Sequence, residues 1–354
     1  NFLSRKSLAK RLWLRGKRDL VLFCTMQLAL VRGSIPEASK RILYVYLGNP
    51  NLGDSIMDLS PRTLWQQCEL EVDMYTNSVM ASLYKNDPTF NRIIIDPKDL
   101  ANSYDFIVLQ SYSWKCLKFK WKYYFFKNFV SLHGHYYGCE FNRLEFAEVA
   151  WRSILNLPRS DESDPCSAVF NLRLDHSIEP QVVRTNKKIA LAVGGIVDWR
   201  TYSYWGEVVD RVNEKLPHKE WLLIGSENGI SLAEKITRNE HKKISNLVNK
   251  ISLEEVFKTL QGVDLLVAAD GGLMNVGRAA KVPIVALFAR EIHPRMRFSN
   301  SDPAYVIHAP QSVDEISPSL IADAIVKRLM QSEKLLVTDY LGDEPECDLD
   351  KEFL

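Results

Sequence analysis

Two hydrophobic patterns alternate along this chain. Short unbroken runs of apolar residues are typical of parallel strands that are covered on both faces. They predict strands at 42–47, 70–75, 92–95, 106–109, 189–193, 221–224, 265–269, 284–289 and 304–308. Apolar residues at helical spacing predict helices at 55–68, 143–155, 230–238, 253–260, 273–280 and 317–330, with another after 201. Ser55 is the expected N-cap of the first of these helices. The alternation predicts an α/β protein with parallel sheets.

The series of strands and helices falls into two halves of similar size. A polar stretch at 156–188, with Pro158, Pro165 and Pro180, separates them and is interpreted as the interdomain connection. The predicted organisation is a basic N-terminal helical extension at 1–40, an N-terminal Rossmann-like domain at 41–180, a C-terminal Rossmann-like domain at 187–316, a helix at 317–332 that can cross back onto the first domain, and an acidic tail at 333–354.

The segment at 263–289 is the most informative part of the chain. A buried strand ends at Asp270-Gly271-Gly272, a helix follows, and a second buried strand comes after Pro283. Open α/β sheets bind ligands at the carboxyl ends of their strands. Glycines let a ligand approach the backbone, the start of the helix supplies unpaired N–H donors, and Asp270 supplies an acceptor for hydroxyl groups. The pattern predicts a binding site, and a tight turn whose glycines serve packing is the alternative.

Composition places the protein in the soluble globular class. Apolar residues make up 46% and charged residues 25% of the 354 residues, which suffices for two domains with a core each. The six cysteines include no C-x-x-C pair, which favours a reducing compartment over a disulfide framework or structural zinc. His133-Gly134-His135 and Cys139 have metal-binding side chains without a fourth ligand nearby, so we expect a loop there and no metal site.

The net charge of +1 conceals two oppositely charged ends. Residues 1–40 carry nine Lys and Arg against Asp19 and Glu37, and residues 333–354 carry eight acidic residues against two lysines. The apolar run at 20–31 is too short to span a bilayer, which takes about 20 residues. A basic helix on an anionic membrane surface is favoured over a secretory signal. A helix that packs on its own domain is the other alternative.

Aromatic residues and lysines are interleaved at 114–129. The lysines are Lys115, Lys118, Lys120, Lys122 and Lys127. Base stacking and phosphate contacts of nucleic acids use the same residue types, but no nucleic-acid-binding signature accompanies them, so no nucleic-acid partner is expected. A surface for a phosphorylated glycolipid is favoured, and an ordinary solvated helix face is the alternative.

Several motifs occur together and in order along the chain. They are Leu52-Gly53-Asp54-Ser55-Ile56-Met57, Ala192, Trp205, Leu223-Ile224-Gly225-Ser226, Ile251-Ser252-Leu253-Glu254-Glu255, Asp270-Gly271-Gly272-Leu273-Met274-Asn275 and Pro283-Ile284-Val285-Ala286-Leu287-Phe288. As a set they resemble glycosyltransferase family 9, the ADP-heptose:lipopolysaccharide heptosyltransferases of Gram-negative bacteria. The resemblance extends from about residue 41 to residue 330.

The resemblance implies a GT-B fold, in which two Rossmann-like domains face each other across a cleft. It also implies an inverting sugar transfer without a metal or another cofactor, with the donor on the C-terminal domain and the acceptor on the N-terminal one. Asp54 stands at the position of the family's catalytic base, and Asp270 at that of a residue that holds the transferred sugar. Independently of the family, a carboxylate after a glycine at a strand-to-helix turn can project into a crevice; a charge partner of the helix start is the alternative.

The sequence departs from the family at two donor-binding positions. Asp198 occupies the position of a lysine that supplies positive charge to the diphosphate, and Arg200 is the nearest cation. Asn275 stands where the family has a histidine. These departures leave open a donor other than ADP-heptose. The other cations considered for the phosphates are Lys281, Arg290, Arg295 and Arg297.

The sequence thus predicts transfer of a sugar, with heptose from ADP-heptose as the first candidate, to a lipopolysaccharide or lipooligosaccharide core acceptor. The expected donor-binding residues are Asp270, Gly271, Gly272, Leu273, Met274, Asn275, Arg200, Gly225, Ser226 and Glu227, and the acceptor-binding residues are Asn51, Gly53, Lys115, Lys118, Lys120 and Lys122. A transferase of the same fold with a UDP- or GDP-hexose donor is one alternative, and a non-catalytic subunit that binds nucleotide sugars or glycans is another. The expected location is the cytoplasmic face of the inner membrane, as a peripheral protein.

Overall fold

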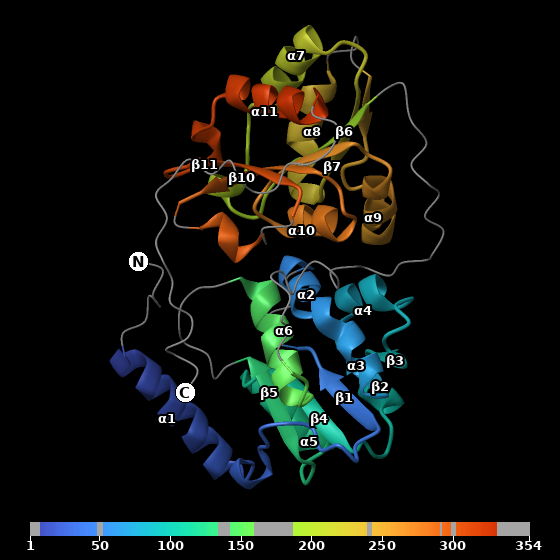
Figure 1. The fold of residues 1–354 in the computed structure, drawn as a ribbon, viewed down its shortest axis with the longest axis vertical. Helices are drawn as coiled ribbons and strands as arrows, with labels where there is room; N and C mark the ends of the chain where they lie inside the picture. Colours follow the sequence, from blue (N-terminus) through green and yellow to red (C-terminus); the bar gives the residue numbers. More distant parts are fainter. Residues whose placement is uncertain are drawn as a thin grey trace. The chain divides into compact units, whose positions relative to one another are not determined.

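The computed structural model describes residues 8–47, 52–133, 142–158, 187–238, 243–290, 292–298 and 302–330. They form two compact units, one made of the described residues up to 158 and the other of those from 187. Each unit contains one parallel sheet with helices on both faces (Figure 1). The predicted α/β class with two Rossmann-like domains is confirmed.

The first unit is built on a five-stranded sheet in the order β3-β2-β1-β4-β5. Its strands are β1 (Arg41–Val45), β2 (Glu71–Tyr75), β3 (Arg92–Ile94), β4 (Phe106–Ser111) and β5 (Phe129–His133). Its helices are α1 (Leu8–Cys24), α2 (Leu52–Asp58), α3 (Leu64–Gln67), α4 (Ser78–Tyr84), α5 (Trp114–Tyr123) and α6 (Arg143–Ile154), with 3-10 turns at Leu28–Leu30, Ser60–Thr63 and Pro97–Asp99.

Successive residues of β1 enter two different packing layers, as the pleat of a strand requires. Leu43 and Val45 belong to the cluster that α5 covers, and Leu22 of α1 joins the same cluster. Tyr44 packs on the other face against Trp65 and Trp151, at ring-centroid distances of 6.2 and 5.3 Å. The N-terminal helix is therefore anchored in the core of the first unit.

The second unit is built on a six-stranded sheet in the order β11-β10-β9-β6-β7-β8. Its strands are β6 (Lys188–Ala192), β7 (Glu220–Ile224), β8 (Ile244–Asn246), β9 (Leu265–Ala269), β10 (Ile284–Ala289) and β11 (Ala304–Ala309). Its helices are α7 (Trp205–Lys215), α8 (Ile230–Thr237), α9 (Leu253–Gln261), α10 (Gly272–Ala279) and α11 (Pro318–Met330), with 3-10 turns at Asp198–Arg200, Glu227–Gly229, Pro294–Met296 and Val313–Glu315.

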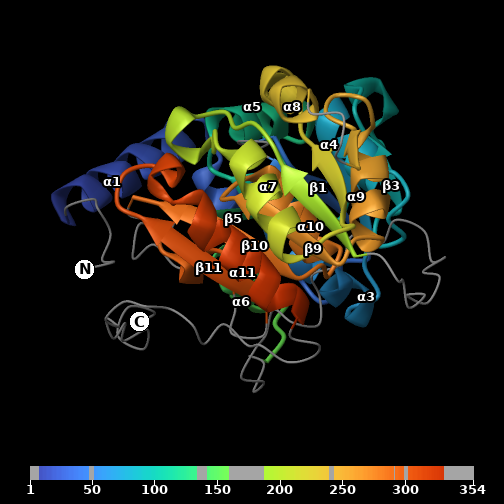
Figure 2. The same ribbon diagram turned by 90° about the horizontal axis from the view of Figure 1, so that it is seen from above.

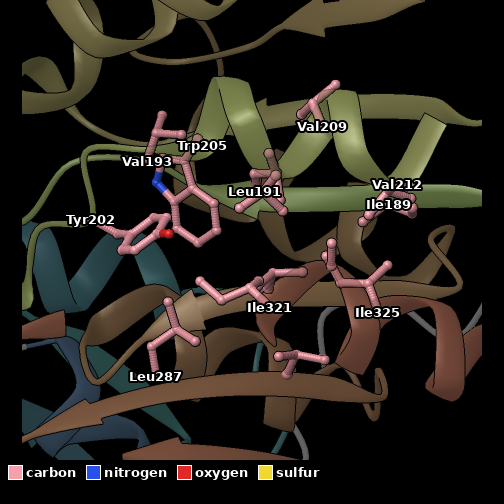
Figure 3. Packing of buried hydrophobic residues seen from close by; sticks show 14 of the residues in the cluster. Ile189, Leu191, Val193, Tyr202, Trp205, Val209, Val212, Leu287, Ile321 and Ile325 are labelled. Carbon is pink, nitrogen blue, oxygen red and sulfur yellow. The ribbon is translucent and has the colours of Figure 1, made fainter. Parts of the chain in front are cut away.

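The core of the second unit fills the space between its sheet and the pair α7 and α11. Both helices lie on the same face of the sheet (Figures 1 and 2). Figure 3 shows Trp205 and Tyr202 packed beside Val193, with Ile321 and Ile325 of α11 in the same cluster. The α11 helix, for which a crossing onto the first domain was considered, therefore belongs to the second unit.

Most predicted elements are present, but the helix expected at 55–68 is wrong in its start and its length. The α2 helix begins at Leu52, so Ser55 lies inside it, where its Oγ donates to the Leu52 carbonyl at 2.8 Å, and is not an N-cap. A 3-10 turn with non-helical backbone angles at Pro61 interrupts the expected helix. Proline lacks the N–H that would continue the α-helical ladder. The short strands β5 and β8 were not predicted.

Candidate functional site

In the second sheet the chain adds β7 and β8 on one side of β6 and then adds β9, β10 and β11 on the other side. In chain order its arrangement is 3-2-1-4-5-6, the doubly wound order of dinucleotide-binding folds. Loops leave the carboxyl ends of the neighbouring strands β6 and β9 in opposite directions, which opens a crevice where such sheets bind ligands. Gly194 and Gly195 follow β6, and Asp270-Gly271-Gly272 follow β9.

Asp270 is the centre of a charged cluster at this edge. Only 4% of the residue is exposed, and its Oδ1 accepts a hydrogen bond from Nε of Arg297 at 3.0 Å. Nη1 of Arg200 lies 3.4 Å from the Oδ2 atom of Asp270. Two guanidinium groups thus meet one carboxylate, so the cluster carries one positive charge in excess. An excess cation beside a helix N-terminus is suited to an anionic ligand.

The loop that carries Arg297 is held to α10 by Arg278. Arg278 Nε donates to Asp302 at 3.1 Å, and its Nη1 donates to the backbone carbonyl of Arg297. Arg200 is supported differently, because its guanidinium stacks on the Trp199 ring at 4.3 Å. Both arginines are therefore placed by contacts of their own before any ligand binds.

The N-terminus of α10 is open on the side of Gly271. Gly271 has an extended backbone with φ −179°, and a Cβ built on it would meet only the Ala269 carbonyl, at 3.7 Å. Neither strain nor crowding therefore requires a glycine here, which counts against the packing alternative. Asn275 is buried, and its Nδ2 donates to the Gly271 carbonyl at 3.0 Å. Its Oδ1 has no hydrogen-bond partner among the described residues.

Glycines bring the loops after β6 and β7 into direct contact. Gly194 has φ +83°, and a Cβ on it would lie 2.7 Å from Cα of Gly229. A Cβ on Gly225 would lie 2.4 Å from the carbonyl oxygen of Val193. Gly225 was predicted as a donor contact, but its immediate role is this close approach. The diglycine after β6 was not predicted as functional, although its sequence and its place after a strand were the signal.

Ser226 and Glu227, the other predicted donor contacts in this loop, are exposed. Ser226 Oγ donates to Asn228 at 2.7 Å, and Asn228 Nδ2 donates to the Gly195 carbonyl at 2.6 Å. The loop is therefore tied to the loop after β6 at the crevice.

The structure restricts the predicted contact of Met274 with the donor and tests the alternative cations. The Met274 side chain is wholly buried among the core residues, so a ligand can meet only its backbone. Leu273 is half-buried. Lys281 is exposed just beyond the C-terminal end of α10, the end opposite the crevice. Of the alternative cations, Arg297 contacts Asp270, whereas Arg290 stacks on the Trp199 ring at 4.6 Å and Arg295 is exposed.

The first unit presents Asp54 in the first turn of α2. Asp54 Oδ1 pairs with Nη1 of Arg143 at 3.1 Å. Arg143 also donates to both carboxylate oxygens of the buried Asp58, at 2.6 and 2.8 Å, and the Tyr46 hydroxyl donates to Asp58 at 3.0 Å. Burial alone would lower the pKa of Arg143, but the Asp58 carboxylate, and then Asp54, raise it well above its usual value. A permanent cation therefore holds the Asp54 carboxylate in place.

Arg143 was not predicted as a site residue. It is the first residue of α6, behind the Asn142 N-cap, and its partners in α2 are more than eighty residues away in the sequence. Only the predicted position of a helix start at residue 143 hinted at an exposed charge there.

The acceptor prediction for Lys120 is wrong. Its side chain is buried, and Nζ donates to the Phe125 carbonyl at 2.9 Å and to Gln27. Burial lowers the pKa of Lys120 to about 7. Lys115, Lys118 and Lys122 are exposed on α5, with Lys115 in its first turn at the carboxyl edge of β4.

Some predictions fall partly or wholly outside the described residues. Asn51, His135, Cys139 and the acidic tail are among these, whereas Gly53 is described and half-buried in the first turn of α2. In the described part of the chain, no three His, Cys, Asp or Glu side chains gather as a metal site would require. In the same part, no helix combines the length and the apolarity needed to cross a bilayer.

Comparison with known proteins gives a family match within the second unit. Residues 198–312 match the model of glycosyltransferase family 9 (heptosyltransferase). No curated protein matches the chain. This match contains Arg200, Asp270 and Arg297, and the family resemblance seen in the sequence is confirmed.

Solved structures share the fold of both units. A family 9 glycosyl transferase from Veillonella parvula has a TM-score of 0.67 at 13% identity, over 84% of this chain and 100% of that one. The E. coli ADP-heptose lps heptosyltransferase II has a TM-score of 0.63 at 17% identity, over 82% of this chain and 98% of that one. E. coli heptosyltransferase WaaC, solved with ADP, has a TM-score of 0.63 at 15% identity, over 81% and 99%. The second unit therefore contains a segment that matches family 9, and the chain shares the two-domain fold of these structures.

Proposed function

We propose that the protein is an inverting glycosyltransferase that moves a sugar from a nucleoside diphosphate to a lipopolysaccharide core acceptor, with heptose from ADP-heptose as the first candidate. The observation that carries the proposal is the cluster of Asp270, Arg200 and Arg297 beside the N-terminus of α10. A donor of this kind brings a diphosphate and sugar hydroxyls to one place. The cluster offers cations for the former and a carboxylate for the latter.

In the proposed reaction, Asp54 removes the proton of the acceptor hydroxyl as its oxygen attacks C1 of the sugar. The bond between C1 and the diphosphate oxygen breaks on the opposite face, and the bonding electrons leave with the nucleoside diphosphate. Arg200, Arg297 and the first amides of α10 stabilise the charge that develops on the leaving group. No metal ion is needed in this scheme, because the protein supplies the positive charge.

Asn275 extends this scheme to the specificity for the donor. Its buried Oδ1 can accept a hydrogen bond from a hydroxyl or N–H group of the nucleotide sugar. The histidine found at this position in the family would present a ring nitrogen there instead of an amide oxygen. We expect the identity of the sugar or base to depend on this residue. The place of action that suits a lipid-linked acceptor is the cytoplasmic face of the inner membrane.

The test of the reaction is Asp54→Asn. We expect turnover to fall by about 10² or more, in line with the loss of a general base, while donor affinity stays nearly unchanged. Asp99→Asn, which alters an exposed carboxylate in the same unit, is the matched control and keeps full activity. Normal turnover of Asp54→Asn would remove Asp54 as the base.

The donor is identified by calorimetry with ADP-heptose, UDP-hexoses and GDP-sugars. Tightest binding of ADP-heptose is expected. Preference for a UDP- or GDP-hexose would assign a different donor to the same site. Binding without turnover by the wild-type protein, with core acceptors present, would favour a nucleotide-sugar-binding subunit.

A further inference from the structure

The outward face of α1 is apolar. Ala9, Trp13, Gly16, Leu20 and Phe23 recur at steps of three and four residues, which places them on one side of the helix. Trp13 is 61% and Phe23 70% exposed. The inward side contributes the buried Leu22 to the core of the first unit. A helix on the surface of a soluble domain normally turns its apolar side inward, so this outward face calls for a partner.

A second exposed apolar segment adjoins the end of this helix. Met26, just after α1, is 71% exposed, and Phe126, just after α5, is 84% exposed. The two segments are neighbours because Gln27 Nε2 donates to the Phe125 carbonyl at 3.3 Å. We refer to the combined region as the α1–α5 surface, and its apolar side chains are Trp13, Leu20, Phe23, Met26, Trp121 and Phe126.

The charges around the α1–α5 surface are almost all positive. Residues 8–35 contain six Lys and Arg against Asp19 alone, and residues 113–133 contain five lysines, of which Lys120 is buried, and no acid. Asp19 is paired with Arg18 at 2.6 Å. The chain as a whole has a net charge of only +1, so this concentration is local. A partner of this surface must therefore be apolar at its centre and anionic around it.

Two lysines stand directly over exposed rings. Lys17 Nζ lies 5.3 Å from the centroid of the Trp13 ring, and Lys122 Nζ lies 5.0 Å from that of Tyr123. In a membrane interface, aromatic rings sit at the level of the headgroups while lysine side chains reach the phosphates. This pairing of ring and ammonium group fits a lipid surface better than a protein groove.

We propose that the α1–α5 surface binds an anionic lipid bilayer, with α1 lying in the plane of the interface. The side chains of Trp13, Leu20 and Phe23 enter the boundary of the acyl chains, and Lys17 and Lys122 contact the lipid phosphates. Apolar insertion and basic attraction together give the two signals that stable membrane attachment requires. The lipid-linked acceptor of the proposed function gives a reason for this attachment, but the binding itself does not depend on sugar transfer.

Co-sedimentation of the full chain with vesicles tests the proposal. We expect binding to vesicles of phosphatidylcholine and phosphatidylglycerol, and at least about tenfold weaker binding to phosphatidylcholine alone. Binding should decrease at about 1 M salt, where the Debye length is about 3 Å. Trp13→Ser/Phe23→Ser should reduce the partition coefficient about tenfold or more. Lys17→Glu/Lys122→Glu should also reduce it, and this reduction should disappear at high salt.

A matched pair of methionines provides the control. Met26→Ser removes an apolar side chain from the surface, and Met330→Ser removes one that is 67% exposed at the end of α11. Only the first should weaken vesicle binding. Equal binding of Trp13→Ser/Phe23→Ser and wild type, or no binding of the wild type, would overturn the proposal. So would a wild-type dimer in sedimentation velocity that this double variant turns into a monomer, because a second copy would then cover the surface.

Donor calorimetry on the same preparations separates this proposal from the proposed function. Vesicle binding by a protein that binds no nucleotide sugar would leave the lipid surface in place and refute the transferase. Donor binding and sugar transfer without vesicle binding would support the transferase and refute the lipid surface.

Discussion

Replacement of Arg143 by methionine separates the structural role of this arginine from its role at Asp54. Arg143 joins two carboxylates, because it donates to both oxygens of Asp58 and pairs with Asp54 at 3.1 Å. Methionine keeps much of the side-chain volume and removes the charge. Asp58 then stays buried with the Tyr46 hydroxyl as its remaining partner described above, and Asp54 loses the cation that orients it.

The structure also sets the size of both effects. Breaking a buried pair by removing one partner costs about 3–5 kcal/mol of the free energy of unfolding. The Asp58 side chain is fully buried but 31% of the Arg143 side chain is exposed, so we expect the lower end, about 3 kcal/mol. A misplacement of a catalytic group by about 1 Å can cost roughly 10²-fold in rate. We therefore expect kcat to fall about 10- to 100-fold, with the KM for the donor unchanged.

The pair Arg62–Asp87 in the same unit is the control. Its Nε to Oδ2 distance is 2.6 Å, and both side chains are only 2% exposed. Arg62→Met should therefore destabilise the fold by a similar or larger amount while the folded enzyme keeps its kcat. Urea unfolding followed by circular dichroism gives the free energies, and release of nucleoside diphosphate below both unfolding transitions gives the rates. Equal kcat values of Arg143→Met and Arg62→Met would refute the positioning role. Partial recovery in Arg143→Lys would support it.

Two further expectations concern single cations. Arg200→Ala and Arg297→Ala should each weaken nucleoside diphosphate binding in calorimetry by roughly 1.5–3 kcal/mol, the contribution of a hydrogen bond to a charged group. Lys281→Ala is the control and should have no effect. An equal loss in Lys281→Ala would contradict the assignment of Arg200 and Arg297 to the diphosphate. Burial lowers the pKa of Lys120 to about 7, so the unfolded chain, with a lysine pKa of about 10.4, binds one proton more than the folded chain between these values. The free energy of unfolding should therefore rise with pH across this window, and Lys120→Met should abolish the rise. Urea unfolding at several pH values measures both. A rise of the same size in the variant would contradict the role of Lys120.

The segment around Asp270 was predicted well because local pattern alone determines it. Unbroken apolar runs on both sides of a diglycine leave little choice besides strand, turn, helix and strand, and the structure has β9, α10 and β10 there. The same reasoning gave α6 to within one residue at its C-terminal end. The short strand β8 was not predicted, because its three residues show no pattern that distinguishes them from a loop.

The prediction that Lys120 binds the acceptor was wrong, and the sequence contained a pattern that indicated its burial. Cys116 and Lys120 are four residues apart on one side of α5, Tyr124 follows four residues later just after the end of the helix, and all three are buried. The interleaved lysines were interpreted as one basic face, although helical spacing separates Lys120 from Lys118. No such signal existed for the partners of Arg143, because an ion pair between distant helices depends on how the chain packs and not on local spacing.

The contact between the loops after β6 and β7 has a consequence for how a donor would bind. A side chain at Gly194, Gly225 or Gly229 would collide with the facing backbone, so the two loops fit together only without side chains at these positions. Loops locked in this way have little conformational freedom left to lose. A ligand that enters the crevice would avoid much of the ordering cost of about 0.5–1.5 kcal/mol for each immobilised side chain. The glycines thus shift the entropy cost of recognition from the binding step to the folding of the chain.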